Sequence, residues 1–183
     1  SWTKVSPFLG ASVEITRAAR IFAGFSTGFS PASTLALGSK EPEQTQQIEG
    51  GLRFASEDRR YRASATGFEL KRNDITIPDG SGQPRPTGDQ RSRGLELETS
   101  VERSRFGAAL NYTFTDGVLT RFSETGIVGF DPATFQPIQG TLDRSGNGSA
   151  FAPRHLLSVR LRADLGQGFL ATAALRANSE QYL

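Results

Sequence analysis

The pattern with the clearest catalytic chemistry is residues 24–28, GFSTG, which matches the G-x-S-x-G arrangement around a nucleophilic serine, here Ser26. That chemistry needs a strand followed directly by a helix, because the sharp turn between them exposes the hydroxyl. Here the five residues lie inside an alternating segment, and Ser30-Pro31 follows where the helix would begin. The single histidine, His155, would have to act as the base, and its position at the start of a later segment indicates a structural hydrogen bond. We therefore expect no catalytic residue and no enzymatic activity.

Aspartates in two of the long connecting segments are the candidate metal ligands, because carboxylate oxygens suit hard cations. They are Asp74, Asp79, Asp89, Asp131 and Asp143. Their spacing fits no calcium loop, so we interpret them as solvated turn carboxylates. The chain has no Cys, no Met and one His, which leaves no soft-metal site either. We expect neither a resident metal nor a cofactor.

Arginines remain as candidates for binding an anionic ligand, because a guanidinium group pairs bidentately with a carboxylate. Arg85, Arg91, Arg121 and Arg144 lie in long connecting segments, and Arg160 lies in a predicted strand. Each also has a simpler role, either in solvent or in a hydrogen bond to a neighbouring side chain. We expect any ligand contacts to come from this set, and both roles stay open for each residue.

Length and composition limit the classes of protein to which the chain can belong. The chain has 183 residues, which is enough for one domain, and 36% are hydrophobic. Its mean hydropathy is −0.38, and no apolar run approaches the roughly 18 to 20 residues of a membrane-spanning helix. A transmembrane strand is not excluded, because it places only every second residue in lipid. The net charge of +2 is too small to predict a nucleic-acid partner.

Strict alternation of apolar and polar residues is the strongest signal in the sequence, and its period of two predicts strands. It occurs in eight segments: 8–15, 20–29, 48–54, 61–67, 95–101, 106–114, 157–165 and 169–177. No charged residue falls on the apolar parity in any of the eight, so each strand has one apolar and one polar face. No helix is comparably clear. The fold class is therefore predicted to be all-β.

The connections between these segments alternate between short and long. Residues 16–19, 55–60, 102–105 and 166–168 form short turns, whereas 30–46, 69–93 and 115–156 are long connections. An antiparallel up-and-down meander then has every short turn at one end. Outer-membrane barrels have this asymmetry and strands of about nine to eleven residues, whereas soluble sandwiches and propellers have no general reason for it.

The long connections are predicted to be polar loops, because 77–88 and 140–149 are rich in turn residues and gain little from burial. The apolar stretch 126–130, GIVGF, and Phe135 lie in the longest of them. Their apolar surface predicts local packing or contact with something outside the chain.

Several short motifs together resemble the barrel of TonB-dependent outer-membrane receptors. They are WTKVSPFLG at 2–10, FAGFSTGFSP at 22–31, EPE at 41–43 with IEGGL at 48–52, RGLELE at 93–98, LNYTFTD at 110–116 and FAPRH at 151–155. Each is weak singly, but their order and spacing along nearly the whole chain are specific. Residues 151–183 are most similar to ferric citrate and related iron-chelate receptors.

This resemblance implies energy-dependent uptake of an iron chelate, such as a siderophore or ferric citrate, across the bacterial outer membrane. In that family a 22-stranded transmembrane barrel encloses an N-terminal plug, and a TonB energy complex pulls on a short N-terminal segment. The implied partners are a ferric chelate, that energy complex, and outer-membrane lipid with lipopolysaccharide, but no nucleic acid. The iron would arrive already chelated. Arg160 would contact an anionic chelate or hydrogen-bond to neighbouring or plug residues, and the arginines of the long connections would contact the chelate, solvent or lipopolysaccharide.

The resemblance also implies that residues 1–183 form part of a barrel wall. About eight strands are present, whereas the plug domain, the early strands and the final strands are absent. Two alternatives stay open. In one, eight strands close into a small outer-membrane barrel with a structural or adhesive role and no transport. In the other, the chain is a soluble β-rich secreted enzyme or binding module, for which we find no catalytic residues.

Overall fold

The computed structural model describes residues 5–30, 42–78, 84–148 and 153–180. Nine antiparallel strands make up this part of the chain. They are β1 (Phe8–Glu14), β2 (Ala19–Ser30), β3 (Glu43–Ala55), β4 (Tyr61–Pro78), β5 (Pro84–Arg103), β6 (Phe106–Phe130), β7 (Pro137–Asp143), β8 (His155–Gly166) and β9 (Phe169–Asn178). None of the described residues forms a helix that could cross a membrane. The predicted all-β class is confirmed.

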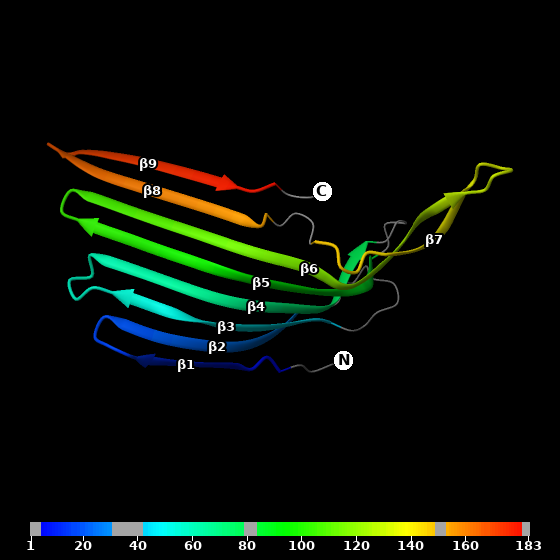
Figure 1. Cartoon of the computed structure of the whole chain (residues 1–183), viewed down its shortest axis with the longest axis horizontal. Helices are drawn as coiled ribbons and strands as arrows, with labels where there is room; N and C mark the ends of the chain where they lie inside the picture. Colours follow the sequence, from blue (N-terminus) through cyan, green and yellow to red (C-terminus); the bar gives the residue numbers. More distant parts are fainter. Residues whose placement is uncertain (1–4, 31–41, 79–83, 149–152, 181–183) are drawn as a thin grey trace.

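The strands form one meander in the order β1-β2-β3-β4-β5-β6-β8-β9, and β7 pairs with β6 outside this path (Figure 1). The register keeps the apolar parity on one face, because Leu97 lies opposite both Ala65 and Tyr112. Among the described residues, β1 pairs only with β2 and β9 only with β8. The eight strands therefore form an open sheet here rather than the small closed barrel of the alternative prediction.

Short turns join the strands at one end of the sheet, on the left of Figure 1, as predicted. Between β1 and β2, the Thr16 hydroxyl accepts hydrogen bonds from the amides of Ala18 and Ala19 at 3.2 and 3.0 Å. Between β8 and β9, Gly166 and Gly168 have φ values of 82° and 83°, which glycine adopts without a steric penalty. Local side-chain and glycine chemistry thus accounts for these reversals.

Two of the predicted long loops, 69–93 and 115–156, are largely strand in their described residues, which corrects the sequence-based prediction. β4 continues to Pro78, β5 begins at Pro84 and β6 runs to Phe130. These extensions keep their backbone pairing after the apolar alternation has ended, because inter-strand hydrogen bonds do not require an apolar face. Of the candidate metal ligands, Asp79 lies outside the described residues.

β6 exchanges its neighbour at the point where the sheet ends. Phe122 pairs with Gly88 of β5, and the next residue, Ser123, pairs with Asp143 of β7. The β6–β7 hairpin then projects away from the other strands (Figure 1). At its base, Ile75 and Phe122 flank Gly88 and are each 6% exposed, which makes them the two buried hydrophobic residues of the described chain.

The apolar parity of the sheet has no second protein layer over it. Leu9, Leu161 and Leu175, for example, are 73%, 50% and 59% exposed. A water-soluble sheet buries such a face against a helix or another sheet. The structure therefore requires an apolar environment on this side, which argues against the soluble alternative.

The length of this apolar face fits an outer membrane. On β5 it is bounded by Arg93 and Arg103, which are ten residues apart, and Leu95 to Val101 lie between them. Ten residues at about 3.3 Å span roughly 33 Å along the strand, or about 25 Å across the membrane for a tilt of about 40°. That value matches the apolar band of outer-membrane barrels.

Candidate functional site

The polar parity of the sheet lines a hollow of about 880 Å³ near the short turns. Its walls include Glu49, Arg62 and Glu98, from three adjacent strands. Because the hollow lies on this side, the polar face is concave and the apolar face is convex. The polar rows therefore face inward and the apolar rows face outward.

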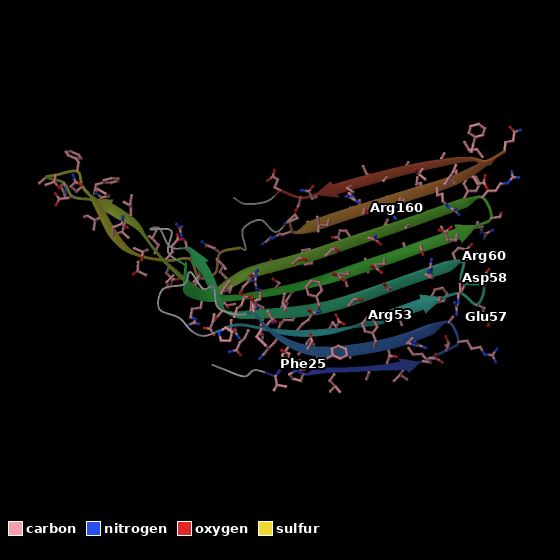
Figure 2. All side chains as sticks on the ribbon, turned by 180° about the vertical axis from the view of Figure 1, so that it is seen from behind. Phe25, Arg53, Glu57, Asp58, Arg60 and Arg160 are labelled. Atoms are coloured by element: carbon pink, nitrogen blue, oxygen red, sulfur yellow. The ribbon has the colours of Figure 1, made fainter. Side chains whose placement is uncertain are left out.

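Phe22 and Arg53, which line one wall of the hollow, form a stack over Gly51. Gly51 has no side chain, and a Cβ added there would come within 3.0 Å of the Phe22 ring. The ring edge therefore occupies the space that a side chain at Gly51 would fill, and the Arg53 guanidinium carbon lies 4.2 Å from the ring centroid. This cation–π contact holds a positive charge toward the interior. Figure 2 shows Arg53 near the turn that carries Glu57, Asp58 and Arg60.

Polar contacts organise the short-turn end around this stack. Arg20 forms an ion pair with Glu14, and the Ser64 hydroxyl donates to a Glu98 carboxylate oxygen at 3.3 Å. In the turn itself, the Ser56 hydroxyl and the Arg60 amide donate to the Asp58 carboxylate and hold its pKa below the ordinary value.

The opposite end of the inward face carries a second network. The Arg72 Nε donates to Glu43 Oε1 at 2.7 Å, and its Nη1 donates to Gln90 Oε1 at 3.4 Å. These three residues lie on adjacent strands and present one guanidinium group to the mouth of the sheet. They were not among the predicted ligand-binding residues, because the alternation that identified the strands ends before them.

Arg121 anchors the base of the projecting hairpin. Its Nε and Nη2 donate to the two carboxylate oxygens of Asp89 at 2.9 and 3.1 Å, and Asp74 lies 3.7 Å from Nη2. The Arg121 hydrogen bonds are the main reason that the pKa of Asp89 lies below its ordinary value. Both aspartates thus act as ion-pair partners in the structure.

The structure does not bring the five predicted ligand-binding arginines into one cluster. Arg160 lies on the inward row of β8 (Figure 2), whereas Arg91 lies on the outward row of β5 between Lys71 and Val118. Arg144 pairs with Glu124 at 2.9 Å at the base of the β6–β7 hairpin. The backbone of Arg85 pairs with Ile77, and its side chain lies outside the described residues.

The serine motif and the histidine occupy structural positions. Ser26 lies in the interior of β2 and pairs with Gln47, so no strand-to-helix turn exposes it. Gly24 makes room for the Glu49 side chain, which lies 3.4 Å from an added Cβ. The His155 Nδ1 lies 2.8 Å from the Tyr112 hydroxyl, which is the structural hydrogen bond predicted for it.

Comparison with known proteins identifies the sheet. The family described as "TonB dependent receptor-like, beta-barrel" matches residues 1–182. The chain belongs to this family. TonB-dependent receptors reside in the bacterial outer membrane, so the convex apolar face contacts lipid and the concave polar face lines the barrel interior.

Solved structures agree with this assignment of the fold. The siderophore receptor PiuA from Acinetobacter baumannii matches with a TM-score of 0.76 and 16% identity, over 96% of this chain and 26% of PiuA. The ferric-catecholate import receptor Fiu from E. coli K12 gives 0.66 and 13%, over 94% of this chain and 25% of Fiu. The RagAB peptide transporter gives 0.62 and 13%, over 92% and 28%. No curated protein matches the sequence.

This TonB-dependent receptor chain spans about a quarter of the length of the solved receptors it matches. Its inward arginines and mouth networks are therefore one sector of the interior of such a barrel. Sequence reasoning missed a further feature of this sector. Charged residues occupy the outward rows just beyond the apolar residues, toward the long connections. They are Glu69, Lys71, Arg93 and Asp116. Their spacing of two residues from the apolar positions was the signal that could have identified them.

Proposed function

We propose that the receptor carrying this chain imports an anionic ferric chelate, of the siderophore or ferric citrate type, with energy from a TonB complex. The match of the barrel family over residues 1–182 is the observation that supports this most strongly. Two of the structurally similar receptors are described as a siderophore receptor and a ferric-catecholate import receptor. The proposal assigns no enzymatic step to the chain.

The inward guanidinium groups would provide the electrostatic attraction for such a cargo. Arg160 lies on the inward row of β8 between Ala109 and Ala174, and it has no ion-pair partner in the described part of the chain. Its charge is therefore available to a carboxylate or catecholate oxygen. Arg121 and Arg144 already bind carboxylates, so we assign them to shaping the extracellular hairpins.

Uptake of radioactive iron supplied as defined chelates tests this proposal. Cells lacking the receptor gene should lose uptake of one chelate class, and cells lacking TonB should lose it equally. Ferric citrate and a ferric catecholate would be compared in the same strain with a peptide that carries its own radioactive label. Loss of peptide uptake alone, or uptake that is independent of TonB, would overturn the proposal.

The residue assignment needs a separate variant. Arg160→Gln should raise the chelate concentration for half-maximal uptake by about tenfold, because a hydrogen bond to a charged group is lost. Arg105→Gln is the matched control, since Arg105 lies in the short turn between β5 and β6. Equal effects of the two substitutions, at equal receptor abundance, would contradict the role of Arg160 and leave the transport proposal intact.

A further inference from the structure

The chain contains four asparagines, and the structure places one of them in a setting that differs from that of the other three. Asn147 lies in the segment that follows β7, and both Asn147 and the next residue, Gly148, are exposed. Asn73, Asn111 and Asn178 lie within β4, β6 and β9. The segment with Asn147 lies at the long-connection end of the sheet, which is the extracellular end in an outer-membrane barrel.

The backbone at Asn147 forms a bulge against β6. The Leu119 amide donates to the Asn147 carbonyl oxygen at 2.9 Å, and the Gly146 amide donates to the Leu119 carbonyl oxygen at 2.8 Å. Two residues thus lie opposite one, and the first of them, Gly146, has a positive φ of 90°, as in a G1 bulge. The next pair is Val118 with Gly148. Because hydrogen bonding alternates along an antiparallel pair, the Gly148 amide points away from β6.

The Gly148 amide has no hydrogen-bond partner in the part of the chain that the structure describes. The amide that follows each of the other three asparagines is held by a partner. They are the amide of Asp74, which donates to Asp89 Oδ1 at 3.1 Å, that of Ser179, which donates to the His155 carbonyl oxygen at 3.0 Å, and that of Tyr112, which has a paired strand on each side. A free amide therefore follows Asn147 and none of the other three.

An exposed asparagine before a free glycine amide can react with its own backbone. The Gly148 nitrogen bonds to the carbonyl carbon of the Asn147 side chain, and ammonia leaves as a five-membered succinimide ring closes. Water then adds to either ring carbonyl and opens the ring, which gives aspartate or isoaspartate. The sequence consumes water, releases ammonia and changes no oxidation state. Glycine favours ring closure, because it has no side chain to obstruct the approach.

We propose that Asn147 is a self-deamidation site whose isoaspartyl product detaches this segment from β6. In isoaspartate the main chain runs through the former side chain and is one atom longer. The carbonyl group that accepts the Leu119 amide leaves the main chain and becomes a free carboxylate, so the bulge loses its register. This inference does not depend on which cargo the barrel transports.

The new carboxylate would lie beside an existing ion pair at the base of the β6–β7 hairpin. The Asn147 amide donates to the Arg144 carbonyl oxygen at 3.1 Å, and the Arg144 side chain pairs with Glu124 at 2.9 Å. Deamidation thus adds a negative charge and a longer backbone at the place where the hairpin returns to the wall. Because the reaction is irreversible, older receptor molecules carry a looser hairpin than newly made ones.

Incubation of the purified receptor that carries this chain at mildly alkaline pH, followed by peptide mass spectrometry, tests the site. The peptide with Asn147 should convert first, into two products that separate by chromatography, while Asn111 and Asn178 keep their amides. Gly148→Val should slow the conversion by about tenfold, because a β-branched side chain hinders ring closure. A Cβ added at Gly148 has its nearest neighbour 3.9 Å away, so this variant should assemble.

Hydrogen exchange at Leu119 tests the structural consequence. Protection of this amide should fall about fivefold in the isoaspartyl fraction, since one backbone hydrogen bond is lost. Asn147→Asp is the matched control, because it adds the same charge without lengthening the main chain, and its Leu119 amide should stay protected. Equal conversion of the three asparagines, no conversion at Asn147, no slowing by Gly148→Val, or unchanged Leu119 protection in the isoaspartyl fraction would overturn the proposal.

Discussion

On β5 the outward row runs Leu95, Leu97, Thr99 and Val101, whereas the inward row over the same stretch contains Glu96 and Glu98. The two rows share one backbone and one set of inter-strand hydrogen bonds. They differ in the medium that each contacts, lipid outside and a polar interior inside. The mean hydropathy of −0.38 therefore averages two surfaces with opposite requirements.

The largest expected effect comes from placing a charged side chain on the outward row. Leu97→Arg or Leu161→Arg should reduce the free energy of folding into the membrane by about 2 to 4 kcal/mol, because a cation is placed at mid-bilayer depth. Glu98→Gln, one residue away on the inward row, is the control and should be milder. Urea titration of the receptor in lipid vesicles measures both, and equal tolerance of the two changes would contradict the assignment of faces.

Two glycines, Gly51 on the inward face and Gly67 on the outward face, differ in the space available for a side chain. Gly51→Val should destabilise the receptor by about 1 to 3 kcal/mol, because the added Cβ would lie 2.2 Å from the Ala65 carbonyl oxygen and would displace the Phe22 ring. At Gly67, on an outward row, the nearest atom to an added Cβ is 3.9 Å away. Gly67→Val should therefore be tolerated in the same urea titration, and the opposite order would refute this packing.

A smaller effect should come from the cation–π contact on the inward face. Arg53→Gln should lower the free energy of unfolding by about 0.5 to 1 kcal/mol, because the guanidinium group no longer stacks on Phe22. Arg62→Gln removes a charge from the same hollow, and no ring contact of Arg62 occurs among the described residues. If the two variants lose equal stability, the stack contributes nothing beyond charge.

The least effect on global stability should come from the hairpin tip, which belongs to neither face. The amides of Thr134 and Ala133 donate to the Asp131 carboxylate and hold its pKa below the ordinary value. A depressed folded-state pKa stabilises the turn above the unfolded pKa, and this contribution is lost as the pH falls through the folded value. Protection of these two amides against hydrogen exchange, measured relative to the intrinsic exchange rate at each pH, should therefore fall on acidification.

Asp131→Ala provides the control for that titration. Protection at Thr134 and Ala133 should be low at neutral pH in this variant and should not fall further on acidification. Global unfolding should stay unchanged, because the tip lies beyond the last residue that β6 shares with β5. A pH response that persists in the variant would assign it to another group.

The strands that cross the membrane were predictable because lipid on one side imposes a period of two. The eight alternating segments and the four short turns all appear in the structure. Their extensions were not predictable by the same rule. The stretch from Glu69 to Pro78 has water on both sides, so its sequence loses the alternation of apolar and polar residues while its backbone keeps its partners. Asp74 interrupts the ladder with a φ of 57°.

β7 was missed for a related reason. Gly126 pairs with Gly140, and these positions give no side-chain signal, although they make room for Leu142 and Val128. The available signal was Asp131-Pro132, a pair typical of the first two positions of a type I turn. Among the site residues, the inward position of Arg160 followed from parity, whereas the Arg121–Asp89 pair depends on a bulge that no pattern indicated.

The exchange of neighbours along β6 has a mechanical consequence. Up to Phe114 the strand pairs with β5 on one side and with β8 on the other, and up to Phe122 it keeps β5. From Ser123 onward its partner in the described chain is β7. Bending stiffness in a sheet rises with the number of bonded neighbours, so the hairpin deflects more easily than the wall. A load at the tip of the hairpin is therefore focused at its root, where Ile75, Gly88 and Phe122 join the compliant part of the molecule to the stiff part.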